Sequence, residues 1–255
     1  EINTERLDVS TKLGYVFKDM PYQSIGFQNA FTSHNQQSYF GLSQYKIKQN
    51  SYYSNLIFNS IINNTMHKFA TGLNFSLDNY QEFVSRKDWS RTDNSIGAFF
   101  EYTYDNDENF SLILGGRIDN HNRLGTFVTP RLHLRYNPWE KAVIRFSAGR
   151  GKRSANIFAE SQSLFASSRA FSILDTNGKI YGLNPEIAWN YGGSFTQSFL
   201  LFGKSADVSL DLYRTDFQNQ VVVDVMQSPQ QVLFYNLRGN SFANSFQIEF
   251  NYEMI

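Results

Sequence analysis

Few side chains in this sequence are spaced for catalysis or for metal binding. The four histidines, His34, His67, His121 and His133, do not show the H-x-x-x-H spacing that directs two imidazoles at one metal ion. The sequence also contains no G-x-S-x-G nucleophile turn, no H-E-x-x-H motif and no phosphate-binding loop. We therefore expect that the protein is not an enzyme and that it carries no cofactor or metal of its own.

Charged residues recur at every second position of several segments. Arg131, His133 and Arg135 alternate along one segment, and Glu101 and Asp119 occupy polar positions of two others. Side chains at alternate positions of a strand share one face. We expect the opposite charges on this face to form ion pairs rather than an acid–base pair. The residues predicted to line it are Arg117, Arg131, His133, Arg135, Arg145 and Glu101.

A basic, serine-rich stretch runs from Gly149 to Arg169. Its guanidinium and ammonium groups suit anionic or aromatic ligands. Tyrosine and tryptophan residues in other irregular stretches could add contacts. The alternative role for each is solubility or anchoring at a membrane interface. The candidates for a ligand path are Arg150, Lys152, Arg153, Arg169, Tyr39, Tyr45, Tyr80 and Trp89.

The elements that must position these residues are β-strands, because apolar and polar residues alternate almost throughout. In residues 68–77, Phe69, Leu73 and Phe75 share one face, whereas Lys68 and Asn74 share the other. The segments run about 10–15 residues, longer than the five or six typical of globular sheets. We expect about eleven strands, near residues 4–17, 22–34, 49–62, 66–78, 94–105, 109–120, 126–137, 141–151, 185–201, 205–223 and 232–255.

The connections between these strands alternate between short polar turns and long stretches. The long stretches lie near residues 34–49, 78–93, 119–129, 150–184 and 224–231. An outer-membrane barrel keeps tight periplasmic turns at one rim and long extracellular loops at the other. A soluble sandwich has no physical reason to do so. We predict an all-β antiparallel meander, one partial transmembrane barrel domain over residues 1–255, with its polar face toward the lumen.

Composition is consistent with this prediction. Aromatic residues make up 16% of the chain, as barrels with aromatic girdles require. The 23 basic and 23 acidic residues balance, which argues against a nucleic-acid partner. No apolar run is long enough for a transmembrane helix, and the absence of cysteine excludes a disulfide scaffold. The chain shows no signal peptide and ends within a strand pattern, so we expect an internal fragment.

Several motifs resemble the barrel domain of TonB-dependent outer-membrane receptors, in the style of Bacteroidetes. The segment from Gly149 to Glu160 is similar to the G-x-G-x-R-x-x-x-x-x-x-E pattern of that family. The other similar motifs, in the order of the family, are Thr129-Pro130-Arg131, Leu183-Asn184-Pro185-Glu186 followed by Asn190-Tyr191-Gly192, Tyr213-Arg214-Thr215-Asp216-Phe217 and Tyr235-Asn236-Leu237-Arg238-Gly239.

This resemblance implies a 22-stranded barrel in the bacterial outer membrane, with a plug domain inside. Such a receptor imports a scarce nutrient, an iron-siderophore or a cobalamin, and is energised through TonB. The implied partners are the lipid bilayer, the nutrient ligand and TonB, which would be reached through an N-terminal region that lies outside this chain. The sequence departs from the family at Lys152, where an aromatic residue is usual, and at Ala155 and Asn156, near a frequent proline.

Three alternatives fit parts of the same pattern. A SusC-like glycan importer would work with an external lipoprotein. A passive porin-type or adhesin-like barrel would close with fewer strands and hold no plug. A soluble β enzyme would be extractable without detergent.

Overall fold

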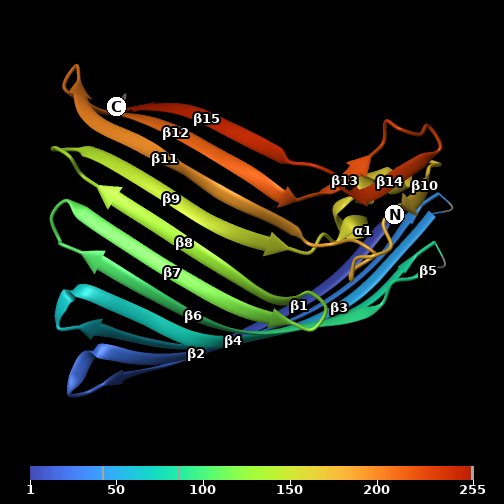
Figure 1. The fold of residues 1–255 in the computed structure, drawn as a ribbon, viewed down its shortest axis with the longest axis horizontal. Helices are drawn as coiled ribbons and strands as arrows, with labels where there is room; N and C mark the ends of the chain where they lie inside the picture. Colours follow the sequence, from blue (N-terminus) through green and yellow to red (C-terminus); the bar gives the residue numbers. More distant parts are fainter. Residues whose placement is uncertain (42, 86, 254–255) are drawn as a thin grey trace.

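The fold is one large, curved, open antiparallel sheet with a small folded cap at one end, as a computed structural model shows (Figure 1). The structure describes residues 1–41, 43–85 and 87–253. The strand order follows the chain, β1-β2-β3-β4-β6-β7-β8-β9-β11-β12-β15, and the short strand β5 pairs with β4. Every pairing in this sheet is antiparallel, from β1 with β2 to β12 with β15.

The strands of the main sheet are β1 (Ile2–Phe17), β2 (Met20–Phe40), β3 (Ser43–Ile62), β4 (Asn64–Val84), β5 (Lys87–Asp88), β6 (Arg91–Asp105), β7 (Phe110–His121), β8 (Gly125–Tyr136), β9 (Ala142–Arg153), β11 (Glu186–Leu201), β12 (Lys204–Asn219) and β15 (Ser241–Tyr252). The cap contains α1 (Ile157–Glu160), the 3₁₀ turn η1 (Gln162–Ala166), β10 (Ala170–Ile173), β13 (Val221–Asp224) and β14 (Gln231–Asn236).

Each of the eleven predicted segments contains a strand of the main sheet, in the predicted order, which confirms the meander. The last two predicted strands are too long, because residues 205–223 divide into β12 and β13 and residues 232–255 into β14 and β15, and β13 and β14 belong to the cap. Three of the predicted long connections are wrong, because residues 34–49, 78–93 and 119–129 lie mostly in strands. Strands β2 and β4 are each 21 residues long. A transmembrane strand needs about 9–11 residues to cross the bilayer core. The surplus residues therefore extend beyond the membrane as paired hairpins, and the basic segment 149–153 belongs to β9.

The two faces of the sheet differ in chemistry as expected. One face is apolar and exposed, and includes Leu73 (56% exposed), Ile96 (60%) and Phe100 (51%). Cross-strand pairs keep this character, since Leu132 faces Leu114 on one neighbour and Ala148 on the other. The alternate positions carry Arg131 and the other polar residues. An apolar outer face and a polar inner face are what a barrel wall in lipid requires.

The connections from β9 to β11 and from β12 to β15 build the cap. Strands β10, β14 and β13 form a second sheet in that order, with β10 parallel to β14. Phe158, Phe165, Val232 and Phe234 form its core and are each at most 2% exposed. This core also packs against Tyr45 and other residues of β3 and β4. Figure 1 shows the cap beside the ends of β3 and β5.

The path of the cap residues shows that the polar face of the sheet is its concave face. Residues 154–185 leave β9 and return to β11, yet they contact strands on the far side of the curve. In η1, Gln162 accepts a hydrogen bond from Gln36 of β2 at 2.9 Å. The direct path between distant strands of a curved sheet crosses its concave side. Within the described residues, no helix is long and apolar enough to cross a membrane.

Candidate functional site

A cationic cavity of about 480 Å³ opens on the concave face where β8, β9 and β11 meet. Gly149 and Gly151 of β9 leave room for it, because neither places a side chain on this face. A Cβ at Gly151 would have no atom within 4 Å. The polar and charged side chains around the cavity are Arg131, His133, Ser147, Arg150, Lys152, Arg153, Glu186 and Asn190.

Three arginines and one lysine therefore line the cavity together with one carboxylate, Glu186. Arg153 is held at 2.5 Å from Glu186 and at 3.1 Å from Glu160. Arg150 donates to Gln218 at 3.0 Å and lies 4.4 Å from the centre of the Phe127 ring. The ammonium group of Lys152 lies 4.6 Å from the same ring. This nitrogen is buried without a hydrogen-bond partner among the described residues, so it can donate to an anion.

A second cavity of about 380 Å³ adjoins the first along the wall. Arg117, at its rim, pairs with Asp119 at 2.7 Å and donates to the Asn74 carbonyl at 2.8 Å. Arg131 borders both cavities and pairs with Glu101. These arginines are held in place by partners from neighbouring strands. The concave wall thus presents a row of fixed cations.

Two of the residues predicted to line the lumen, Arg135 and Arg145, lie closer to the end of the sheet with the short turns than the cationic cavity does. Arg135 of β8 pairs in register with Arg145 of β9, on the polar face. Arg135 also borders a small cavity of about 250 Å³ together with Asp105, Asp107 and Glu108. The carboxylates of this turn offset the two like charges. Arg135 and Arg145 are therefore separate from the cationic cavity.

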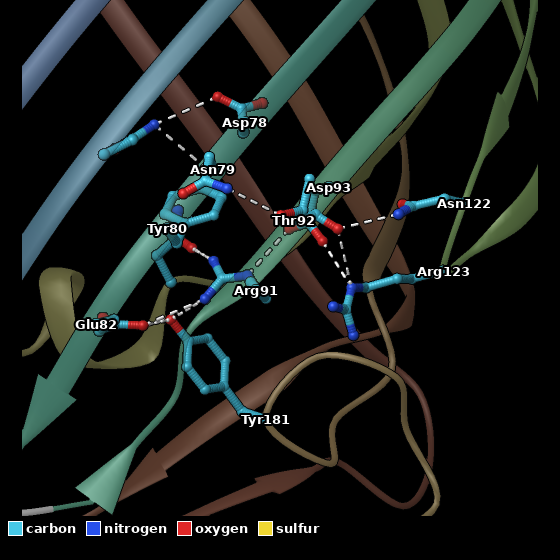
Figure 2. Close-up of polar contacts among 12 residues, drawn as sticks. Asp78, Asn79, Tyr80, Glu82, Arg91, Thr92, Asp93, Asn122, Arg123 and Tyr181 are labelled. Atoms are coloured by element: carbon cyan, nitrogen blue, oxygen red, sulfur yellow. Dashed lines mark hydrogen bonds and ion pairs between the residues drawn. The ribbon is translucent and has the colours of Figure 1, made fainter.

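A buried polar network fixes the cap to the wall (Figure 2). Arg91 of β6 lies at its centre, 3.2 Å from Glu82 of β4 and 3.0 Å from Asp93. Arg91 also donates to the Tyr181 hydroxyl at 2.6 Å and to the side-chain oxygen Oδ1 of Asn156 at 2.5 Å. We call these five residues the anchor network. Since Asn156 and Tyr181 belong to the cap, the network joins the cap to two strands.

Further contacts surround the anchor network. Tyr45 donates to Glu82 at 3.0 Å, and Tyr181 donates to the other oxygen of the same carboxylate. The Arg91 guanidinium lies 4.0 Å from the centre of the Tyr80 ring. Arg123, between β7 and β8, pairs with Asp93 at 2.9 Å. Two arginines thus balance two carboxylates, as burial of charge requires.

The environment of Tyr181 keeps its hydroxyl protonated. Burial raises the pKa of this phenol, and the negative charge of Glu82 raises it further. A neutral Tyr181 can donate to Glu82 while it accepts from Arg91. The anchor network is therefore fully hydrogen-bonded at its most buried point. These contacts join the cap to β4 and β6.

The eight predicted ligand-path residues fall into separate places. Arg150, Lys152 and Arg153 meet at the cationic cavity. Arg169 and Trp89 lie together in another cavity, at the outer side of the cap. Tyr39 is 43% exposed near the end of β2. The placement of Tyr39, Tyr45 and Tyr80 in loops needs correction, because all three lie in strands that extend past the membrane.

The role predicted for Tyr45 also needs correction. Its side chain is 0% exposed in the cap core and is hydrogen-bonded to Glu82, which leaves no surface for a ligand. Tyr80 lies under Arg91 and contributes to the anchor network's surroundings. Both residues support the cap. Tyr45 and Tyr80 are far from the cap residues in the sequence, so the sequence pattern did not predict that they contact the cap.

The sequence interpretation missed the anchor network. The spacing of the polar residues could have revealed it. Asp78, Tyr80 and Glu82 occupy alternate positions on one face of β4, and Arg91 and Asp93 do so on β6. Because residues 78–93 were predicted to be a loop, their shared strand faces were not considered. The described residues contain no group of three or more His, Cys, Asp or Glu side chains that could hold a metal ion.

Comparison with known proteins agrees with this architecture. Three solved structures with similar folds are the siderophore receptor PirA from Pseudomonas aeruginosa, the hemophore receptor HasR of Serratia marcescens in complex with its hemophore and heme, and the alcaligin outer-membrane receptor FauA from Bordetella pertussis. Their TM-scores are 0.60, 0.68 and 0.66, at 12%, 14% and 15% sequence identity. The alignments cover 96%, 99% and 100% of this chain but only 53%, 46% and 44% of those chains.

The chain therefore spans about half the length of these receptors, and at such identities they support the fold alone. No curated protein matches the sequence. Residues 3–253 match the family described as TonB dependent receptor-like, beta-barrel. The match extends over nearly the whole meander, including the cavity and the cap. The chain belongs to this family of TonB-dependent receptors of the bacterial outer membrane.

Proposed function

We propose that the whole protein is an outer-membrane receptor that imports a scarce anionic nutrient, an iron-siderophore being the leading candidate, with energy supplied through TonB. The observation that carries this proposal is the cationic cavity. Lys152 presents a buried ammonium group without a hydrogen-bond partner among the described residues. Three arginines line the same cavity; Arg131 is paired with Glu101, and Arg153 with Glu160 and Glu186. Such a wall favours a ligand with several negative oxygens.

The position of the cavity supports transport rather than adhesion. It lies on the concave face, and the cap lies at the end of the sheet with the long connections. In outer-membrane barrels that end faces the outside. A ligand that entered past the cap would meet the cationic wall inside the barrel. An adhesin would instead need its contacts on the outer surface.

Uptake by cells tests the proposal. The full-length protein is expressed in cells with or without a working TonB, and labelled ferric siderophores, heme, cobalamin and oligosaccharides are supplied. We expect uptake of an anionic chelate that stops without TonB. Uptake that does not depend on TonB would indicate a passive pore. Uptake of an oligosaccharide alone would indicate a glycan importer.

Two variants connect the uptake to the cavity. Lys152→Met removes a cation from the cavity, and Lys204→Met removes an exposed lysine from the short turn at the opposite end. A hydrogen bond to a charged group is worth about 1.5–3 kcal/mol, and 1.4 kcal/mol corresponds to a factor of ten. We expect chelate affinity to fall about tenfold or more for Lys152→Met only. Equal affinities for both variants would locate binding elsewhere.

A further inference from the structure

An unpaired strand edge borders a cavity at the outer side of the cap. Strand β10 pairs with β14 only, through Ala170, which donates to Gln230 at 2.9 Å, and Leu174, which donates to Phe234 at 3.0 Å. Backbone groups of alternate residues in a strand point to opposite edges. The N–H and C=O groups of Phe171 and Ile173 therefore point away from β14. No other strand of the described residues pairs with that edge.

The cavity beside this edge measures about 610 Å³. Its opposite wall is formed by the end of β4 and by β5, including Val84, Ser85 and Lys87. Trp89 and Phe158 also border it, and Phe158 is 2% exposed. Neighbouring strands in a sheet lie about 4.8 Å apart. The cavity lies directly beside the free edge of β10, on the side where an added strand would pair, and Trp89 and Phe158 are among its lining residues.

The charges at this cavity have one sign. Lys87 and Arg169 border it, and its described lining contains no carboxylate. Lys87 lies 4.1 Å from the centre of the Trp89 ring, and Arg169 donates one N–H to the Val225 carbonyl at 2.7 Å. Each retains further N–H donors. Serine hydroxyls at Ser43, Ser85, Ser168 and Ser172 complete a polar rim.

The geometry points to a docking site for an extended acidic segment of a separate extracellular protein. The segment would add to the β13–β14–β10 sheet as a fourth strand, next to β10. Its backbone would pair with Phe171 and Ile173, as in other cases of strand addition. Its inward side chains would rest on Trp89 and Phe158, and an acidic side chain would pair with Lys87 or Arg169. This site is separate from the cationic cavity and does not depend on the proposed nutrient.

Exposed strand edges are normally covered, shortened or blocked by charge. The edge of β10 instead borders a cavity with cations on both sides and aromatic rings at its base. The free edges of β1 and β15, at the two ends of the main sheet, are of a different kind from the edge of β10, because they belong to the barrel wall. The edge of β10 belongs to the cap, where the long connections place it outside the membrane.

Peptide binding to the purified full-length receptor tests the inference. This chain has no cysteine, so Ser168→Cys at the rim accepts a single fluorophore once any cysteine in the rest of the receptor has been replaced by serine. The probe is a synthetic peptide that alternates valine and glutamate, and its control alternates valine and lysine. We expect saturable binding of the acidic peptide, weakened by salt, and at least tenfold weaker binding of the basic one. No binding of the acidic peptide would overturn the inference.

Two controls separate strand addition from simple charge attraction. Peptides methylated on the backbone nitrogens of one edge cannot pair through that edge. We expect one methylated peptide to lose binding and the peptide methylated on the opposite edge to keep it. Equal binding of the two would overturn strand addition. Preferential binding of a sulfated oligosaccharide over the acidic peptide would assign the site to glycans instead.

A matched pair of variants locates the site. Lys87→Glu reverses a charge at the cavity, and Lys179→Glu reverses the charge of an exposed lysine outside its lining. We expect at least fivefold weaker peptide binding for Lys87→Glu and unchanged binding for Lys179→Glu. Equal effects would overturn the location. Because peptide binding is measured without uptake, its result is independent of the transport experiment.

Discussion

Arg91 carries a positive charge at a side chain that is only 5% exposed. Its contacts with Glu82, Asp93, Asn156 and Tyr181 use the fork of guanidinium donors that lysine lacks. Removal of one partner from a buried ion pair is far more damaging than removal of an exposed pair. A single side chain of the wall therefore joins two cap residues to two carboxylates of the wall.

We predict that Arg91→Met loosens the cap. The substitution leaves Glu82 and Asp93 with fewer partners, which costs roughly 3–5 kcal/mol for a broken buried pair. Hydrogen exchange of the backbone amides of residues 155–183 in the full-length protein measures the effect. Exchange there should become faster, while exchange in β7 and β8 should not change.

The control for this experiment is Arg6→Met. Arg6 pairs with Asp8 at 2.7 Å, and its side chain is 60% exposed. Exposed pairs contribute little to stability because water screens the two charges. Cap exchange should therefore equal that of the unaltered protein. Equal protection of the cap in Arg91→Met and Arg6→Met would show that the anchor network does not hold the cap.

Tyr181 gives the anchor network a dependence on pH. Burial and the Glu82 charge raise the pKa of its phenol above the ordinary value of about 10. A group whose pKa is raised on folding contributes stability that is fully present below its unfolded pKa and is lost as pH rises through its folded pKa. The cap should therefore hold through neutral pH and loosen only in strong alkali.

Absorbance of the phenolate tests this expectation. The difference between the titrations of the unaltered receptor and of Tyr181→Phe isolates this phenol from the other tyrosines of the receptor. We expect no phenolate from Tyr181 at pH values where exposed tyrosines have ionised. Ionisation near pH 10 would show that the hydroxyl is not enclosed between Glu82 and Arg91.

Among the elements, the connection 154–185 is held by tight backbone packing as well as by the anchor network. A Cβ at Gly178 would lie 2.0 Å from the carbonyl carbon of Leu183, whereas a Cβ at Gly116 of β7 would meet no atom within 4 Å. We predict that Gly178→Ala speeds proteolysis of the cap and that Gly116→Ala does not. Equal cleavage rates for the two variants would show that the backbone around Gly178 accommodates a Cβ without loss of stability.

The strand elements could be predicted from the sequence because each carries its own alternation of polar and apolar residues. The eleven strands and the shared face of Glu101, Arg117 and Arg131 follow from that local pattern. The extension of β2, β3 and β4 beyond the membrane could not be predicted in the same way. There both faces meet water or the cap, so polar residues interrupt the alternation.

The cap and the anchor network were not predictable from local pattern either. Tyr181 and Glu82 are 99 residues apart, and their contact depends on how the sheet curves. The same applies to the cationic cavity. The basic residues of 149–153 were identified as candidates, but the contribution of Arg131 and His133 to the same cavity depends on the register of β8 with β9.

For the whole molecule, the difference between the two faces determines which changes the membrane tolerates. Leu212 of β12 is 60% exposed on the apolar face. Its partner in β11 is Gly193, and the next residue, Ser194, belongs to the polar face opposite Asp211 and Arg145. The two positions thus lie at nearly the same depth on opposite sides of one wall.

We predict that Leu212→Arg destabilises the folded receptor and that Ser194→Arg does not. An arginine on the lipid side near the bilayer midplane costs about 2–4 kcal/mol, whereas the lumen is wet. Unfolding by denaturant in lipid vesicles measures both variants of the full-length protein. Ser194 lies between Asp211 and Arg145, so an arginine there faces one charge of each sign in a wet lumen. If both variants lost the same stability, both faces would be buried in protein. If only Ser194→Arg lost stability, the polar face would be the one in contact with lipid.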